Sequence, residues 1–178
     1  MSLEALDQQI EAVRARAKSL QKTIGDDQKA IENNPNLSPE GRKADLAEMK
    51  EAARSRMASI RAEENKLATD RRDSLRRTVM GTVGYDSSSI ISYRDAQDRA
   101  AKLADRDDAA RVMERALTSG DKALASAVAE VALDRGYRDV YNSYASANPA
   151  IAEAAKDLAV MEHYFTSGGM ARALAYMV

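Results

Sequence analysis

The sequence predicts an all-α protein, with a long N-terminal coiled-coil hairpin of two helices followed by a compact bundle of four to five short helices. Three observations support this fold class. Apolar residues near the N-terminus recur at alternating steps of three and four, and residues 42–80 contain neither Gly nor Pro. Aromatic residues make up only 4% of the chain, with no Trp and one Phe. A core without large aromatic side chains is typical of Ala-rich helices that approach one another closely.

The first helix of the hairpin is expected between a cap at Ser2 and the break at Asn33-Asn34-Pro35. Its apolar residues follow the a and d positions of a coiled-coil heptad. This seam comprises Leu3, Leu6, Ile10, Val13, Ala17, Leu20 and Ile24. Excepting the small Ala17, these side chains are the predicted protein interface, either within the hairpin or with another subunit.

A second, longer helix is expected to start at Ser38-Pro39-Glu40, where a cap precedes proline at the first helical position. It carries an apolar stripe that includes Met57, Ile60 and Leu67. Because only the segment NNPNLSP separates the two helices, they are expected to be antiparallel. Residues 1–80 are therefore predicted to form the hairpin.

Four arginines gather near the end of this second helix, in DRRDSLRR: Arg71, Arg72, Arg76 and Arg77. One interpretation is a solvated helix end, with these cations near the helix C-terminus and paired with Asp70 and Asp73. The other is a contact surface for phosphate or for an acidic partner. Interleaved acids and the lack of stacking aromatics argue against a dedicated nucleic-acid face.

The segment MGTVGYDSSSIISY, residues 80–93, joins the two halves of the chain. Its Gly81-x-x-Gly84 spacing resembles the backbone-clamping loop of the KH module, but that fold needs strands that the sequence does not show. We expect a helix end at Gly81 and a hinge at Gly81 and Gly84. The predicted domains are thus the hairpin 1–80, the linker 81–91 and the helical bundle 92–178, with the linker's apolar residues lying against the bundle or a neighbouring subunit.

Within the bundle, one helix is predicted over 92–119, capped by Ser92 and ended by Gly120. Further helices are expected from Asp121 to Gly136, over 138–147, and from Asn148-Pro149 to the Ser167-Gly168-Gly169 stop. In this interpretation Asp105, Asp107 and Asp108 lie inside a helix and form surface ion pairs with neighbouring arginines.

Motifs for catalysis are not found in the sequence. There is no Cys and a single histidine, His163, which is expected at a surface or boundary position. No phosphate-binding glycine loop and no nucleophile elbow occurs. We therefore expect no enzyme activity, no cofactor and no metal. Without an apolar leader or a run long enough to span a bilayer, a soluble protein that contacts no membrane is expected.

The C-terminal half carries the stretch MERALTSGDKALASAVAEVALDRGYRDVYNSYASANPAI, in which Ala-rich helices meet at SGD and RGY-DV junctions. This half, residues 92–178, resembles small helical virion structural proteins of tailed phages that infect actinobacteria. The resemblance implies a place in the head or at the head–tail junction, as a connector, a minor capsid protein or a scaffold. It implies assembly in the cytoplasm followed by incorporation into the virion, and it transfers no catalytic residue.

The interpretation favoured by the sequence is a non-enzymatic assembly protein that acts through helical contacts with itself, as a homo-oligomer, or with other virion proteins. Two alternatives stay open. One is a nucleic-acid-associated helical protein that uses the Arg71–Arg77 cluster. The other is a bacterial coiled-coil adaptor with no connection to phages.

Overall fold

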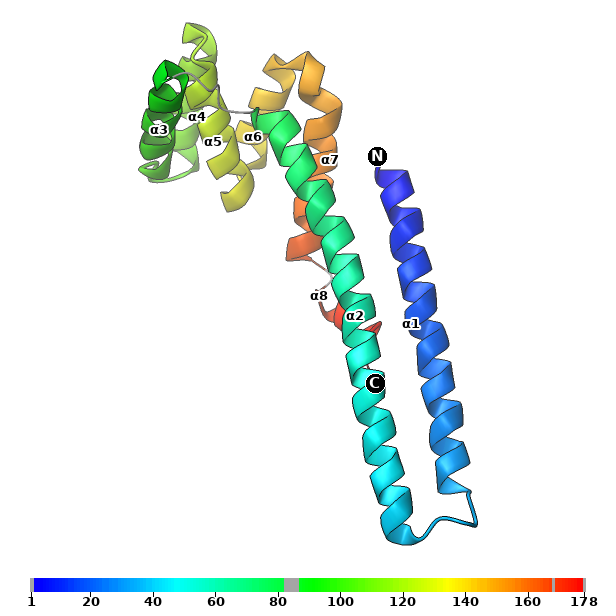
Figure 1. Ribbon diagram of the computed structural model, residues 1–178. Helices are drawn as coiled ribbons and strands as arrows, with labels where there is room; N and C mark the ends of the chain where they lie inside the picture. The colour runs from blue at the N-terminus through cyan, green and yellow to red at the C-terminus, as the bar shows by residue number, and fades with distance from the viewer. Residues whose placement is uncertain (1, 82–86, 168, 178) are drawn as a thin grey trace. The chain divides into compact units, whose positions relative to one another are not determined.

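The structure, a computed structural model, describes residues 2–81, 87–167 and 169–177, and throughout these residues it consists of helices and turns without any strand (Figure 1). The predicted all-α class is confirmed. In chain order the elements are α1 (Leu3–Glu32), α2 (Pro39–Met80), α3 (Ser87–Ala101), α4 (Arg106–Ser119), α5 (Lys122–Arg135), α6 (Arg138–Ala147), the 3-10 turn η1 (Pro149–Ile151), α7 (Ala152–Thr166) and α8 (Gly169–Leu174).

The chain divides into two compact units. Unit 1 comprises Met1–Arg71 with Phe165–Val178, and unit 2 comprises Arg72–Tyr164. This division differs from the boundaries predicted from the sequence, which follow the glycines and serines of residues 81–91. Both α2 and α7 continue from one unit into the other. The reason is that packing between side chains, rather than the positions of Gly and Ser along the chain, determines which residues cluster.

In unit 1, α1 and the first part of α2 run antiparallel (Figure 1). Ser2 caps α1 by accepting a hydrogen bond from the Ala5 amide. The ion pairs Arg14–Glu64 and Arg16–Glu63 connect the two helices. The C-terminal segment also packs here, because Tyr176 forms a buried cluster with Ala17 of α1 and Met57 of α2. The hairpin is thus a three-part assembly, and its coiled-coil geometry stays a prediction.

Unit 2 packs α3, α4, α5 and α6 around a core built mainly of small side chains. Every buried residue of α3 is alanine, and α5 buries four alanines beside Leu124 and Val128. Small faces allow the close helix approach that the low aromatic content predicts. Larger residues fill the remaining space, namely Met113, Val140, Tyr141, Tyr144 and Leu158.

The start of the bundle corrects two predictions. Helix α3 begins at Ser87, so Ser92 lies inside a helix and caps none, and residues 87–91 are helix where a linker was predicted. The single helix predicted over 92–119 is two helices, α3 and α4. Asp105 causes the second difference: its carboxylate accepts a hydrogen bond from the Asp108 amide at 2.8 Å and so caps α4.

The corner between α3 and α4 is held from the opposite side by α5. The Leu103 side chain is buried there, and the Leu103 carbonyl accepts a hydrogen bond from Arg135 Nη1 at 2.6 Å. The predicted surface pairing of the neighbouring charges is present for two of the three acids, as Arg111 with Asp108 and Arg106 with Asp107. Arg106 also pairs with Asp139 of α6, which was not predicted. Further on, helix ends agree with the sequence: α4 and α5 stop at Gly120 and Gly136, both left-handed, and Asp121 caps α5.

Candidate functional site

The residues predicted as an interface seam lie on the inner side of the hairpin. Leu6, Ile10 and Val13 are buried within the single chain. The other members, Leu3, Leu20 and Ile24, are partly buried. Because these side chains are buried or partly buried within one chain, little of their apolar surface is accessible to a partner. Any interaction surface of unit 1 therefore lies on its outer faces.

A buried carboxylate lies among these apolar residues. Glu64 is 1% exposed and accepts two hydrogen bonds from Arg14, from Nε at 2.8 Å and from Nη2 at 2.7 Å. The Tyr176 hydroxyl donates a third hydrogen bond to the same carboxylate. Paired, bidentate geometry of this kind is what allows a charge to be buried. The cluster joins α1, α2 and the C-terminal segment of unit 1.

This cluster was not predicted from the sequence, although the sequence contains a signal for it. Glu64 continues the spacing of Met57 and Ile60 along the apolar stripe of α2, so a carboxylate stands where an apolar residue is expected. A charge at such a position requires a partner facing it. Arg14 follows the seam residue Val13 directly, and so could have been named as that partner. Tyr176 could not have been found, because nothing in the sequence brings residue 176 to the hairpin.

Burial, followed by the hydrogen bond with Glu64, raises the pKa of Tyr176 to about 12. In the unfolded chain a tyrosine side chain has a pKa of about 10. We therefore expect the stability contributed by Tyr176 to be complete below about pH 10 and to be lost as the pH rises toward about 12. Urea unfolding of the natural protein and of Tyr176→Phe over this range checks this. The variant should lose less stability with rising pH; equal losses would contradict the assignment.

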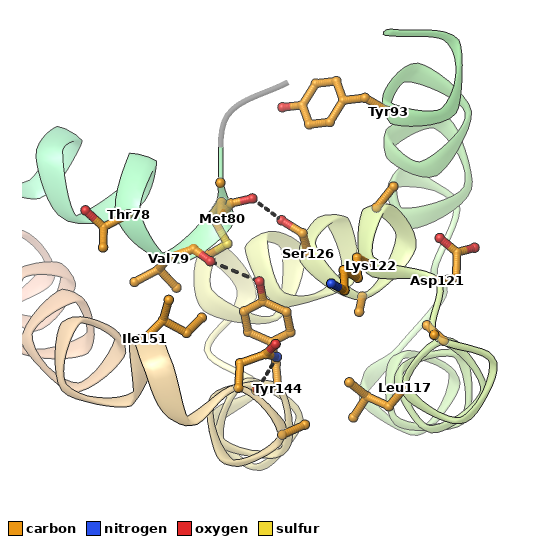
Figure 2. A pocket seen from close by; sticks show the side chains of 17 residues that line it. Thr78, Val79, Met80, Tyr93, Leu117, Asp121, Lys122, Ser126, Tyr144 and Ile151 are labelled. Carbon is orange, nitrogen blue, oxygen red and sulfur yellow. Dashed lines mark hydrogen bonds between the residues drawn. The ribbon is translucent and has the colours of Figure 1, made fainter. Parts of the chain in front are cut away.

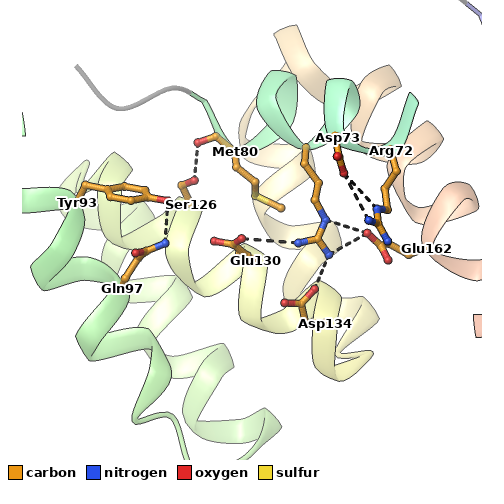
Figure 3. A network of polar contacts seen from close by, with 10 residues as sticks. Arg72, Asp73, Met80, Tyr93, Gln97, Ser126, Glu130, Asp134 and Glu162 are labelled. Carbon is orange, nitrogen blue, oxygen red and sulfur yellow. Dashed lines mark hydrogen bonds and ion pairs between the residues drawn. The ribbon is translucent and has the colours of Figure 1, made fainter. Parts of the chain in front are cut away.

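Arg76 of α2 forms a polar network in unit 2 with Glu130, Asp134 and Glu162, which are labelled in Figure 3. Its guanidinium pairs with Asp134 of α5 at 2.5 Å, with Glu162 of α7 at 2.8 Å and with Glu130 of α5 at 3.7 Å. The Arg76 side chain is 27% exposed and that of Glu162 is 19% exposed. Burial is the largest single influence on the pKa of Arg76 and lowers it. The hydrogen bonds and charges of Asp134 and Glu162 together outweigh burial, so the pKa is raised. Arg76 thus holds three helices of unit 2 together.

The other members of the predicted arginine cluster are arranged differently. Arg72 lies 3.4 Å from Asp73, whereas Asp70, the other expected partner, pairs with Lys66. Arg71 is half-buried, and Arg77 is exposed. The role predicted for the four arginines with phosphate or an acidic partner stays a prediction.

A pocket of about 590 Å³ lies in unit 2 beside the end of α2 (Figure 2). Two hydroxyl groups in its wall bind the last carbonyls of α2: Tyr144 donates to the Val79 oxygen at 2.9 Å, and Ser126 to the Met80 oxygen at 2.7 Å. The last carbonyls of a helix have no partner within it. These side chains therefore anchor the helix end, and the walls that remain are mainly apolar, including Leu117 and Ile151.

Of the two predicted hinge glycines, Gly81 ends α2 with φ of 80°, a left-handed conformation that glycine adopts without strain. Gly84 lies outside the described residues, as do the linker residues Val83 and Tyr85. Whether Gly81 acts as a hinge stays a prediction. What the structure shows at this position is a helix end anchored by Tyr144 and Ser126.

The C-terminal segment shows the largest exposed apolar side chains of unit 1. Met170, Leu174 and Met177 are 81%, 59% and 61% exposed. We call these three residues the C-terminal strip. The same segment turns Tyr176 inward and fixes its backbone through a hydrogen bond from Gln21 to the Met177 carbonyl at 2.9 Å. An apolar strip on a segment that is held in place is a typical protein interaction site.

Within the described ranges no group of three or more His, Asp and Glu side chains is placed to hold a metal ion. His163 is exposed on α7. No helix that the structure describes is long and apolar enough to cross a membrane.

Comparison with known proteins finds no matching family model, no matching curated protein and no matching solved structure. Among the described residues, the C-terminal strip brings together three of the large apolar side chains that are exposed. It is the candidate functional site.

Proposed function

We propose that the protein is a non-enzymatic assembly protein that acts through helical protein–protein contacts. The observation that supports this proposal most is the C-terminal strip. Met170, Leu174 and Met177 expose more than half of their apolar side chains on a segment docked to the hairpin by Tyr176. Burying such side chains against a partner removes apolar surface from water, which is the main driving force of association.

The partner that we propose is another copy of the chain or another protein of a phage virion, at the head or the head–tail junction. The resemblance of residues 92–178 to small phage virion proteins supports the virion setting. The geometry is compatible with this role, because the polar networks around Glu64 and Arg76 hold each unit together while the strip stays outward. Such a protein would assemble in the cytoplasm before it enters the virion.

A role in nucleic-acid binding is less well supported. The central cation of the predicted cluster, Arg76, is neutralised by Asp134, Glu162 and Glu130. Phosphate would have to displace these carboxylates. Binding through the remaining arginines would be weak, since each phosphate contact needs an available cation.

The variant Met170→Glu/Leu174→Glu tests the proposed function. We expect this variant to weaken self-association, or association with purified virion proteins, by about tenfold or more. The reason is that a glutamate buried in an apolar contact would be desolvated and would have no partner. Sedimentation velocity and light scattering measure this, with circular dichroism to confirm an unchanged helix content.

Val160→Glu is the matched control, because Val160 is an exposed apolar residue of α7, at 56%. It should leave association within about threefold of the natural protein, the usual result outside the centre of an interface. A chain that stays strictly monomeric, alone and with virion proteins, would refute the proposed function.

A further inference from the structure

A groove of about 320 Å³ runs along one flank of α2 in unit 1. Its walls include Arg54, Ala58 and Arg61 of α2 on one side and Tyr176 of the C-terminal segment on the other. The buried Met57 closes its floor. We call it the basic groove. Its position is set by the docking of Tyr176 onto Glu64, which holds the C-terminal segment against the hairpin.

The charge of the basic groove is positive because the nearby carboxylates are used elsewhere. Glu64 is bound by Arg14, and Glu63 pairs with Arg16 across the hairpin. Arg54 has only a loose partner, Glu51 at 3.7 Å, with both side chains exposed by two thirds or more. In the part of the chain that the structure describes, no ion pair involves Arg61. Two cations therefore line the groove without firm neutralisation.

An acidic surface of matching spacing lies on the first part of α1. Glu4, Asp7 and Glu11 are exposed and, among the described residues, none of them forms an ion pair. At about 100° per residue Glu4 and Glu11 lie on the side of α1 away from Leu6 and Val13, and Asp7 lies on the flank next to them. This acidic face therefore points outward when the apolar residues of α1 are buried.

Glu4 and Glu11 are seven residues apart, as are Arg54 and Arg61. Seven residues make two turns, so each pair spans about 10.5 Å along nearly the same line of its helix. We propose that the acidic face of α1 in one copy of the chain docks on the basic groove of a second copy. This proposal rests on the proposed function, which it deepens by naming the partner and the surfaces that meet.

The two surfaces are different parts of the molecule, so they can pair reciprocally in a two-fold dimer, or each copy can offer its acidic face to one neighbour and its groove to another. Contacts of the second kind close into a ring when the rotation between copies allows it, and otherwise continue as a filament. Exposed ion pairs add little affinity but strongly affect orientation and the choice of partner. The apolar C-terminal strip would supply affinity, and the charges would set the register.

Two charge-reversed variants test the pairing: Arg54→Glu/Arg61→Glu and Glu4→Lys/Glu11→Lys. Each places like charges opposite one another, so each alone should associate about tenfold or more weakly than the natural chain, measured by sedimentation velocity at low salt. Mixing the two variants restores opposite charges at every contact between one variant and the other. The mixture should therefore associate within about threefold of the natural chain, and less strongly as salt is raised.

The control Arg56→Glu/Lys22→Glu carries the same change of net charge as Arg54→Glu/Arg61→Glu, at exposed positions that do not line the groove. It should associate like the natural chain. If the control is weakened as much as the test variants, or if mixing restores nothing, the pairing is wrong. Loss of association in Met170→Glu/Leu174→Glu together with normal association of both charge variants would remove this inference and leave the proposed function standing. A strictly monomeric chain would remove both.

Discussion

Replacing Glu64 with alanine is expected to lower the free energy of unfolding of unit 1 by about 3 kcal/mol. The substitution removes the acceptor of two hydrogen bonds from Arg14 and of one from Tyr176. Removing one partner of a buried ion pair costs more than the pair contributes, because the remaining charge stays desolvated. The value lies at the lower end of the usual range because Arg14 is 40% exposed and can regain water.

Urea unfolding followed by circular dichroism measures this loss, and hydrogen exchange of the α1 amides assigns it to unit 1. Glu63→Ala is the matched control: the neighbouring carboxylate pairs with Arg16, and both side chains are about half exposed. An exposed pair contributes less than about 1 kcal/mol. If the two variants lose equal stability, Glu64 does not have the structural importance assigned to it here.

The Glu64→Ala variant should also release the C-terminal segment. Tyr176 reaches the hairpin through its hydroxyl contact with Glu64 and its packing on Ala17 and Met57. Without the carboxylate, its hydroxyl group is left buried and without its acceptor, which favours undocking. Faster proteolysis near residues 167–177, compared with Glu63→Ala, would show this release. The basic groove, of which Tyr176 forms one wall, would be lost with it.

Replacing Arg76 with methionine is expected to lower the free energy of unfolding of unit 2 by about 2 kcal/mol. Methionine keeps much of the aliphatic stem of arginine, so the change mainly removes the guanidinium. Asp134, Glu162 and Glu130 would then face one another without a cation. Repulsion among the carboxylates adds to the lost hydrogen bonds, and their partial exposure limits the total.

Arg77→Met is the control for this variant, since Arg77 is the next residue of α2 and is exposed. Surface substitutions of this kind usually change stability by less than about 0.5 kcal/mol. Thermal and urea unfolding of both variants compares them directly. A loss in Arg76→Met no larger than in Arg77→Met would show that the network contributes nothing beyond surface charge.

These two clusters illustrate how far local sequence signals reach. Capping residues act over three or four positions, so Ser2, Asp121, Gly120 and Gly136 placed helix ends correctly. Asp105 shows the limit, because its capping bond to the Asp108 amide competes with a continuous helix, and the sequence alone did not decide between them. The burial of Leu103 and the hydrogen bond from Arg135 favour the break, and both depend on packing against other helices.

For the candidate surfaces, sequence reasoning found charges and apolar residues but not their partners. The DRRDSLRR cluster was recognised, yet Arg76 turned out to bind acids that follow it by 54 to 86 positions. The seam of α1 was recognised, and the structure buries its central residues within the chain. The C-terminal strip and the basic groove were not found, because they arise only when residues 165–178 pack with residues 1–71.

The helical class, the order of two long helices followed by shorter ones and most helix ends follow from the sequence, because they depend on interactions between residues a few positions apart. The division into two units, the burial of Glu64 and the commitment of Arg76 follow only from the tertiary structure. The contacts of Glu64 and Arg76 join residues between 50 and 112 positions apart. Such contacts depend on which helix faces are brought together, and the spacing of residues along one helix does not specify the face of another.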